Sequence, residues 1–118
     1  MDTRLVPIQP TEAQNKYLTE RKEDASYETM RTVTQGVELF VEWCETAGID
    51  NLNVIGGRQL TDFKTWVKEN TDTKTISLNG LLSVLRRFMV FCVRIEAVTP
   101  DVPDKVPIPK VPDDEEVS

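Results

Sequence analysis

The hydrophobic pattern of residues 26–48 is typical of one long helix whose two halves face different surroundings. In the second half, residues 39–44 place apolar side chains on nearly every side, which predicts burial. In the first half, the apolar residues form one narrow stripe, made of Tyr27, Met30, Val33 and Val37. The other side of the first half is polar and consists of Glu28, Thr29, Arg31, Thr32 and Gln35. Burial does not explain this polar face, so it is a candidate binding surface.

Three further segments show the spacing of amphipathic helices. The first begins near Thr11 with a capping box, the third spans about 58–69, and the fourth spans about 73–98. The fourth carries a broad apolar stripe that needs two or three packing partners. In the second helix, Ser26 is the predicted N-cap and Gly48 the predicted left-handed stop. No strand period appears, so the sequence predicts a compact all-α bundle of four, or five, helices.

The positions of the prolines divide the chain into three parts. Residues 1–9 lack a helical period and contain Pro7, so they are expected to form a flexible arm, and residues 10–98 form the predicted helical domain. Residues 99–112 hold five of the seven prolines, which predicts a semi-rigid, polyproline-like linker that continues into an acidic tail over 99–118. Such a spacer suggests the front module of a longer protein, although a small protein with a disordered tail has the same composition.

The charge balance is acidic, with a net charge of −6, whereas most nucleic-acid-binding modules are basic. Residues 113–116 contribute four of the negative charges, and residues 11–98 are close to neutral, with 11 basic and 13 acidic side chains. An acidic excess with few lysines and 13 threonines suits a protein that stays hydrated in the salty cytoplasm of a halophile. An ordinary acidic solubility bias gives the same composition.

The chain contains no histidine, which excludes histidine-based acid–base or nucleophilic catalysis. It has no Cys-x-x-Cys pair, so no zinc site or other metal site is predicted. Cys44 and Cys92 are expected to be buried, reduced thiols that act as small hydrophobic groups. No cofactor motif, signal peptide or membrane-spanning segment is recognisable, so the expected location is the cytoplasm.

The fourth helix also has a polar face that its core does not require. Residues 73–95 hold four basic side chains and no acidic one. The polar side consists of Lys74, Thr75, Asn79, Ser83, Arg86, Arg87 and Arg94. Cationic groups neutralise phosphates, hydroxyl and amide groups bond phosphate oxygens or base edges, and helix starts add free N–H groups. The pattern is therefore typical of DNA contact, although a solvated face without function has the same spacing.

Several short motifs follow one another along residues 10–103. They are Tyr17-Leu18, Arg21, Ser26-x-x-Thr29, Leu39-Phe40-x-x-Trp43 and the run LLSVLRRFMVF from Leu81 to Phe91. Their order resembles the N-terminal core-binding domain of tyrosine recombinases, the phage integrase family. The resemblance implies a SAM-like helical fold that clamps one side of a DNA duplex while a separate C-terminal domain holds the other side.

The resemblance implies DNA contacts at the starts of the second and fourth helices. The matching positions are Thr29, Arg31, Thr32, Gln35, Lys74, Thr75, Ser77 and Asn79. Arg86 and Arg87 match a frequent pair of the family. They either contact phosphate or are exposed charges whose aliphatic stems cover neighbouring Phe and Met side chains.

The resemblance also implies that this chain lacks the chemistry of a recombinase. The nucleophilic tyrosine of the family and its catalytic arginines and histidine belong to the C-terminal domain. Tyr17 and Tyr27 match structural positions and are expected to pack with hydrated hydroxyls. The chain alone is therefore expected neither to cut nor to join DNA. The implied partners are double-stranded DNA, other recombinase protomers and the C-terminal catalytic domain of a parent protein, with no membrane involved.

A second hypothesis is a small helical protein-interaction or regulatory domain that uses the same polar faces for a protein partner. Residue spacing alone does not separate the two hypotheses. Binding to duplex DNA that weakens steeply with salt separates them, because phosphate contacts release counterions and protein contacts of this kind do not.

Overall fold

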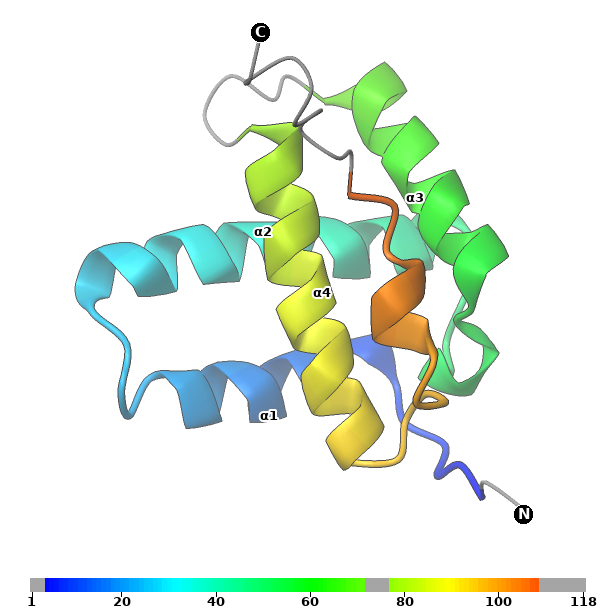
Figure 1. Ribbon diagram of the computed structural model, residues 1–118, viewed down its shortest axis with the longest axis horizontal. Coiled ribbons are helices and arrows are strands. Elements are labelled where there is room, and N and C mark those ends of the chain that lie inside the picture. The colour runs from blue at the N-terminus through cyan, green and yellow to red at the C-terminus, as the bar shows by residue number, and fades with distance from the viewer. Residues whose placement is uncertain (1–3, 72–76, 109–118) are drawn as a thin grey trace, which may run out of the picture.

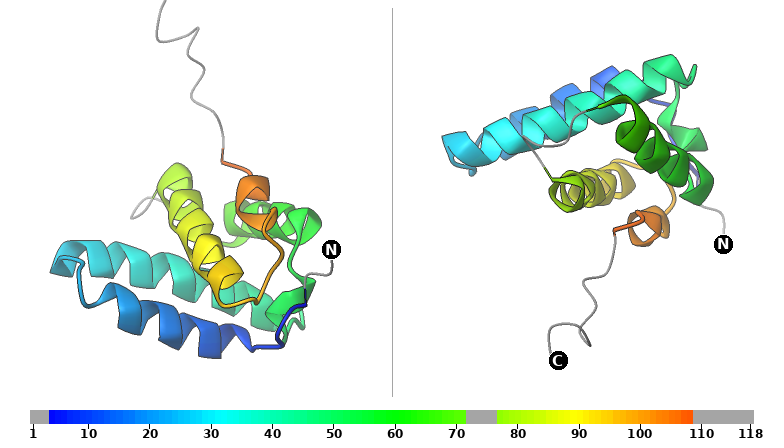
Figure 2. Two further views of the ribbon diagram at one scale, coloured as in Figure 1. Left: turned by 60° about the horizontal axis from the view of Figure 1, so that its bottom comes forward. Right: turned by 90° about the horizontal axis from the view of Figure 1, so that it is seen from above.

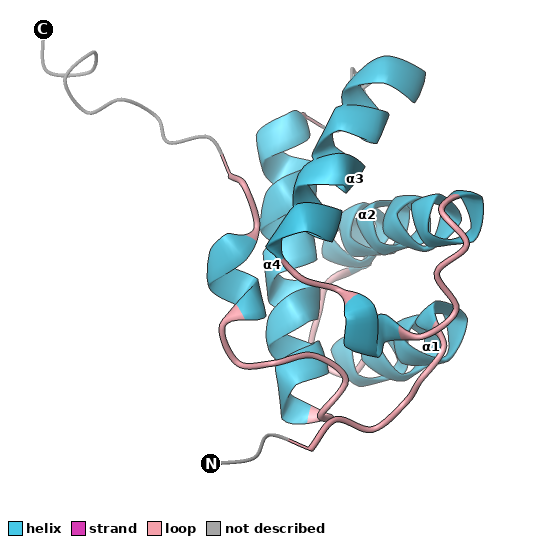
Figure 3. Cartoon of the chain, turned by 90° about the vertical axis from the view of Figure 1, so that its right-hand side faces the viewer, coloured by secondary structure: helices cyan, strands magenta, loops and turns pink. Residues whose placement is uncertain are grey.

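The computed structural model describes residues 4–71 and 77–108, and within these ranges all regular structure is helical (Figure 3). Its four α-helices are α1 (Pro10–Arg21), α2 (Tyr27–Thr46), α3 (Gly57–Asn70) and α4 (Leu78–Arg94). Two short 3-10 helices, η1 (Leu52–Val54) and η2 (Val102–Lys105), precede α3 and follow α4. The predicted all-α fold is confirmed.

The helices form two layers. α1 and α2 lie side by side in opposite directions, and α4 packs across both of them (Figure 1). α3 packs near the end of α2, and η2 contacts both α4 and α3. The first half of α2 therefore extends past α4, on the side of the molecule away from α3 (Figure 2).

Aromatic rings from different helices form the centre of the core. Phe40 of α2 lies edge-on to Phe63 of α3 with ring centroids 5.3 Å apart, and Phe88 of α4 lies 6.1 Å from Phe40. All three side chains are fully buried. Edge-to-face pairs contribute about 0.5–1.5 kcal/mol each beyond the apolar area that they bury. These rings hold the second half of α2 in the core, as its pattern predicts, and fix the position of α4 against it.

Both predicted ends of α2 are confirmed, whereas α1 begins earlier than predicted. The Ser26 hydroxyl accepts a hydrogen bond from the backbone N–H of Thr29 at 3.1 Å. Gly48 has a φ of +74°, the left-handed conformation in which the chain leaves a helix at little cost for glycine. α1 begins at Pro10 rather than Thr11, because proline suits the first turn, where its missing N–H needs no partner.

α4 is shorter than predicted. The expected start near residue 73 lies outside the described residues, and within them the helix begins after Ser77, whose hydroxyl caps the first turn. α4 ends at Arg94 instead of Val98. The cause is Glu96, whose φ of 66° turns the backbone out of the helical path.

The segment before α1 is joined to the turn after α4. The backbone N–H of Val6 donates to the carbonyl of Glu96 at 2.8 Å. The Asn53 amide donates to the carbonyls of Val6 and Ala97 at 2.9 and 2.8 Å. The described part of the predicted arm therefore pairs with the folded domain.

Residues 102–106 also belong to the packed structure. Val102, Pro103 and Val106 are buried, and η2 contacts α4. The polyproline-like prediction is wrong for residues 102–105, which form the 3-10 helix η2. Proline is tolerated in the first turn of a helix, so Pro103 does not prevent it. Residues 109–118 lie outside the described residues, and the domain boundaries stay a prediction.

Cys44 and Cys92 are free and fully buried, as predicted. Burial raises the pKa of the Cys44 thiol to about 12 and also raises the pKa of Cys92. Within residues 4–71 and 77–108, no helix is both long and apolar enough to cross a membrane.

Candidate nucleic-acid interface

The first turns of α2 present small polar side chains to solvent. Thr29, Arg31, Thr32 and Gln35 are all exposed. The Thr29 hydroxyl oxygen accepts a hydrogen bond from the Ser26 hydroxyl at 3.0 Å, which leaves the hydroxyl proton of Thr29 available to a ligand. The positive end of the α2 dipole lies at this turn and favours an anion nearby.

α4 crosses α2 at a close contact beside this polar turn. At Gly36, a β-carbon would lie 2.8 Å from the Cγ1 atom of Val84, so glycine permits the approach of the two helices. The crossing leaves a groove of about 370 Å³ between the first half of α2 and the middle of α4. The groove is lined by Tyr17, Glu28, Thr29, Thr32, Val33, Ser83, Val84 and Arg87. The fold therefore brings together three of the predicted site residues, Thr29, Thr32 and Arg87.

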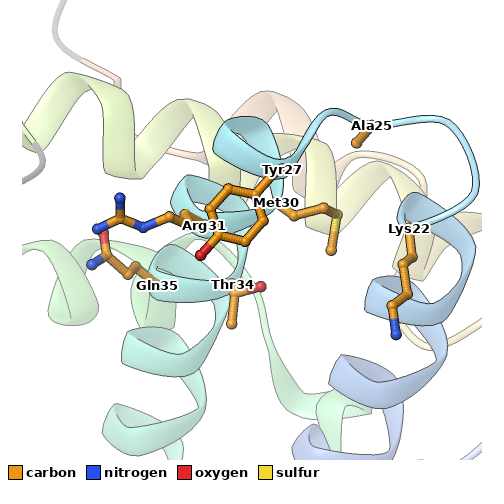
Figure 4. Close-up of a pocket in the computed structure, with 7 residues that line it drawn as sticks. All are labelled: Lys22, Ala25, Tyr27, Met30, Arg31, Thr34 and Gln35. Carbon is orange, nitrogen blue, oxygen red and sulfur yellow. The ribbon is translucent and has the colours of Figure 1, made fainter.

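Arg31 and Gln35 line a separate hollow. This hollow has a volume of about 550 Å³ and lies between the start of α2 and the end of α1 (Figure 4). Its lining residues are Lys22, Ala25, Tyr27, Met30, Arg31, Thr34 and Gln35. The polar residues predicted on α2 thus divide between two neighbouring surfaces of the same helix.

The two adjacent arginines of α4 have different surroundings. Arg86 donates to the Asp104 carboxylate of η2 at 3.2 Å. Arg87 lines the groove, and no acidic side chain among the described residues lies within 4.0 Å of it. Arg94, about two turns further along α4, pairs with Glu20 of α1. Of these three, Arg87 keeps its charge available to a ligand.

Ser77 and Asn79, the predicted residues at the start of α4 that the structure describes, are not part of the groove lining. Ser77 and Asn79 are exposed, and the Ser77 hydroxyl oxygen accepts a hydrogen bond from the N–H of Gly80. Lys74 and Thr75 lie outside the described residues.

Tyr17 lines the groove although it was not among the predicted site residues, and Ser83 lines it as a member of the polar face predicted on the fourth helix. The Tyr17 side chain is 4% exposed, with its ring 5.2 Å from that of Phe88 and 5.1 Å from that of Phe91. Burial raises the pKa of Tyr17, and the nearby positive charges of Arg21 and Arg87 oppose this rise. The sequence signal for Tyr17 is that of a core residue, and the position of its polar end becomes visible only once α1 and α4 are packed together.

The prediction that Tyr27 packs is wrong. Its side chain is 79% exposed, at the first turn of α2 and beyond the reach of the core. Tyr27 lies beside Met30 and Arg31 in the lining of the hollow between α2 and the end of α1 (Figure 4). The apolar stripe of α2 is therefore buried from Val33 onward.

A solved structure of similar fold and sequence is the crystal structure of the N-terminal domain of a phage integrase/site-specific recombinase from Haloarcula marismortui. It is 29% identical to this chain with a TM-score of 0.80, and the match covers 88% of this chain and 99% of that one. The predicted resemblance is thereby confirmed. No family model matches the chain, and no curated protein matches it.

Proposed function

Since this chain is similar in sequence and fold to the N-terminal domain of a phage integrase/site-specific recombinase, we propose that it binds duplex DNA for site-specific recombination. In this proposal it acts in the cytoplasm as the non-catalytic clamp of a parent recombinase. A C-terminal catalytic domain of that parent supplies the strand-cutting chemistry, and other protomers hold the second half of the target site.

The observation that supports this proposal is the shared groove of α2 and α4. Hydroxyl groups of Thr29, Thr32 and Ser83 line it together with Arg87. Hydroxyl and guanidinium groups are the donors that proteins direct at phosphate and sugar oxygens. Small side chains also let a helix backbone approach the major groove, which is about 12 Å wide.

The charge distribution supports weak binding by the domain alone. The described part of α4 carries three arginines and no acid, but two of these arginines are engaged by Glu20 and Asp104. Glu28 adds a negative charge to the groove itself. Such a surface makes few phosphate contacts, so the parent protein depends on both of its domains to hold DNA.

The test is the binding of a labelled duplex to the 118-residue chain across a salt series, measured by fluorescence anisotropy. The affinity is expected to fall as salt rises, because phosphate contacts release counterions. Arg87→Gln is expected to lower the slope of log affinity against log salt by about one. Arg86→Gln, which removes the same charge from an arginine already paired with Asp104, is expected to change the slope less. Lys68→Gln on the exposed side of α3 is the distant control. If the affinity of the unsubstituted 118-residue chain does not change with salt, the proposal of DNA binding is contradicted.

A different observation favours the second candidate function, a protein-interaction domain. The hollow at Tyr27 and Met30 combines exposed apolar surface with Lys22 and Arg31, and Tyr, Met and Arg are enriched in protein interfaces. Both candidate functions include the same protein partner, a second recombinase protomer. Sedimentation of the chain and of Tyr27→Ala over a concentration series tests it, and identical monomeric behaviour of both contradicts self-association through this hollow.

A further inference from the structure

We propose that the groove between α2 and α4 binds a single phosphodiester group of the DNA backbone, and that Tyr17 of α1 donates a hydrogen bond to it. The inference rests on the proposed DNA binding and goes further, because it assigns a direct DNA contact to a residue for which the sequence predicts a structural role, a packed ring with a hydrated hydroxyl. It also assigns an opposing role to Glu28, the acidic side chain in the groove lining.

The first support is the unpartnered hydroxyl of Tyr17. The side chain is 4% exposed, and no hydrogen bond joins its hydroxyl to any of the described residues. Buried tyrosine hydroxyls usually have a partner. This hydroxyl is not among the fully enclosed polar atoms, so it reaches solvent through the groove that Tyr17 lines.

The second support is the rigidity of this hydroxyl. The Tyr17 ring is held against Phe88 and Phe91, with centroid distances of 5.2 and 5.1 Å, and both rings are buried in α4. A donor fixed by packing loses little conformational freedom when a ligand binds. The contact is therefore preorganised in the unbound chain.

The third support is the set of donors that accompanies Tyr17. Arg87 contributes a positive charge without an acidic partner among the described residues. The Thr29 hydroxyl already accepts a bond from Ser26 and has its own proton left to donate. Thr32 and Ser83 add two further hydroxyls from opposite walls of the groove. A site built of donors selects a ligand that only accepts, and a phosphate oxygen is such a ligand.

Glu28 narrows the ligand to a singly charged anion. Its carboxylate lines the same groove and repels negative charge there. A phosphodiester carries one negative charge, whereas a free phosphate carries more at neutral pH. The groove is therefore better matched to a backbone phosphate of DNA than to inorganic phosphate or a phosphorylated small molecule.

The main test compares a Tyr17 variant of the 118-residue chain with a distant hydroxyl variant in duplex-DNA binding at low salt. Tyr17→Phe removes the hydroxyl and keeps the ring, and it is expected to weaken binding about tenfold, as for a lost hydrogen bond to a charged group. Thr61→Val, which removes a hydroxyl from an exposed position of α3 that lines neither the groove nor the hollow, is the control and is expected to bind like the unsubstituted chain. The thermal midpoint of Tyr17→Phe is expected to equal or exceed that of the parent, because the lost hydroxyl has no internal partner. Weaker DNA binding without a loss of thermal stability separates a direct contact of Tyr17 with DNA from a structural role of its hydroxyl.

A second pair of variants tests Glu28. Glu28→Gln and Glu45→Gln each remove one negative charge from exposed positions of α2, at its first and last turns. Only Glu28 lines the groove, so Glu28→Gln is expected to tighten DNA binding several-fold more than Glu45→Gln. Equal effects of the two variants mean a general charge effect and overturn the role of Glu28.

The outcomes separate this inference from the proposed function. If the unsubstituted chain and Tyr17→Phe bind duplex DNA equally while Arg87→Gln binds it more weakly, DNA binding stands and the Tyr17 contact is overturned.

If the unsubstituted chain does not bind duplex DNA, the ¹⁵N-labelled chain is titrated with inorganic phosphate. Saturable shifts at Arg87 then assign the groove to a free phosphate, and their absence excludes an anion site. Either result overturns the phosphodiester contact.

Discussion

Cys44 of α2 and Cys92 of α4 each place a thiol in the fully buried core. The low-polarity surroundings disfavour a thiolate, so burial raises the pKa of Cys44 from 9.0 to about 12 and raises that of Cys92 as well. A buried thiol of this kind acts as a small apolar side chain and resists oxidation or alkylation while the chain is folded.

These pKa shifts predict a loss of stability at alkaline pH. Above pH 9.0 the unfolded chain releases the Cys44 proton while the folded chain retains it, so the stabilisation is complete below this pH. The free energy of unfolding is expected to fall by about 1.4 kcal/mol per pH unit for each buried thiol as the pH rises above that value. Urea unfolding followed by circular dichroism over this range measures the slope.

The double variant Cys44→Ala/Cys92→Ala is the control for this prediction. It keeps Tyr17, whose raised pKa adds its own alkaline dependence, and it removes only the two thiols. A slope unchanged in the double variant would show that the thiols are not responsible.

Single residues also show the limits of what the sequence predicts. The helical spacing predicts the burial of both cysteines correctly, because burial depends on a side chain's place in the apolar stripe. It fails at Tyr27, since the stripe runs past the end of the neighbouring helices and nothing in the pattern marks where they stop. For Tyr17, the prediction of a packed ring with a hydrated hydroxyl agrees with the structure, but the pattern does not show that this hydroxyl lies at the groove between α2 and α4.

At the scale of the helices, end signals made of a single side chain are predicted best. Ser26 and Gly48 act locally, through one hydroxyl bond and one left-handed residue, and both are confirmed. The start of α4 is harder, because residues 73, 75 and 77 all carry hydroxyls that can cap a helix. Ser77 is the cap that the described residues contain. The crossing of α2 and α4 depends on Gly36, whose role cannot be read from either helix alone.

Gly36→Ala is expected to destabilise the chain by pushing α2 and α4 apart. The added β-carbon would lie 2.8 Å from Cγ1 and 3.2 Å from Cβ of Val84, a stiff β-branched side chain. Overpacking costs about 1–3 kcal/mol, and the better helix propensity of alanine offsets up to about 1 kcal/mol of this cost. Chemical denaturation is expected to show a net loss of about 1–2 kcal/mol.

The same substitution in a Val84→Ala background tests the cause. Removal of the Val84 methyl groups relieves the closest contact, so Gly36→Ala is expected to be neutral or stabilising there. Equal destabilisation in both backgrounds would assign the effect to something other than the helix crossing.

At the scale of the whole molecule, the candidate site depends on chain segments that are distant in sequence. Thr29, Thr32 and Arg87 meet because α4 crosses the first half of α2, and a pattern of residues along one helix contains no information about that crossing. The sequence could therefore predict polar faces but not the division of α2 into two hollows, or the pairing of Arg86 with Asp104. The family resemblance predicted the fold, whereas the groove is defined only by the packing of the helices.

The segment after α4 makes the final contribution to the whole fold. Composition marks residues 99–112 as a linker, yet in the described part of this segment Val102 is 1% exposed and Val106 is 7% exposed, and η2 contacts both α4 and α3. Val102→Ala is expected to lower the free energy of unfolding by about 1–3 kcal/mol, since it removes two buried methyl groups. Val54→Ala, at a side chain 54% exposed, is the matched control and is expected to cost much less. Thermal unfolding of both variants checks this. If Val102→Ala and Val54→Ala have the same midpoint of thermal unfolding, the segment contributes no stability and acts as the spacer that its prolines suggest.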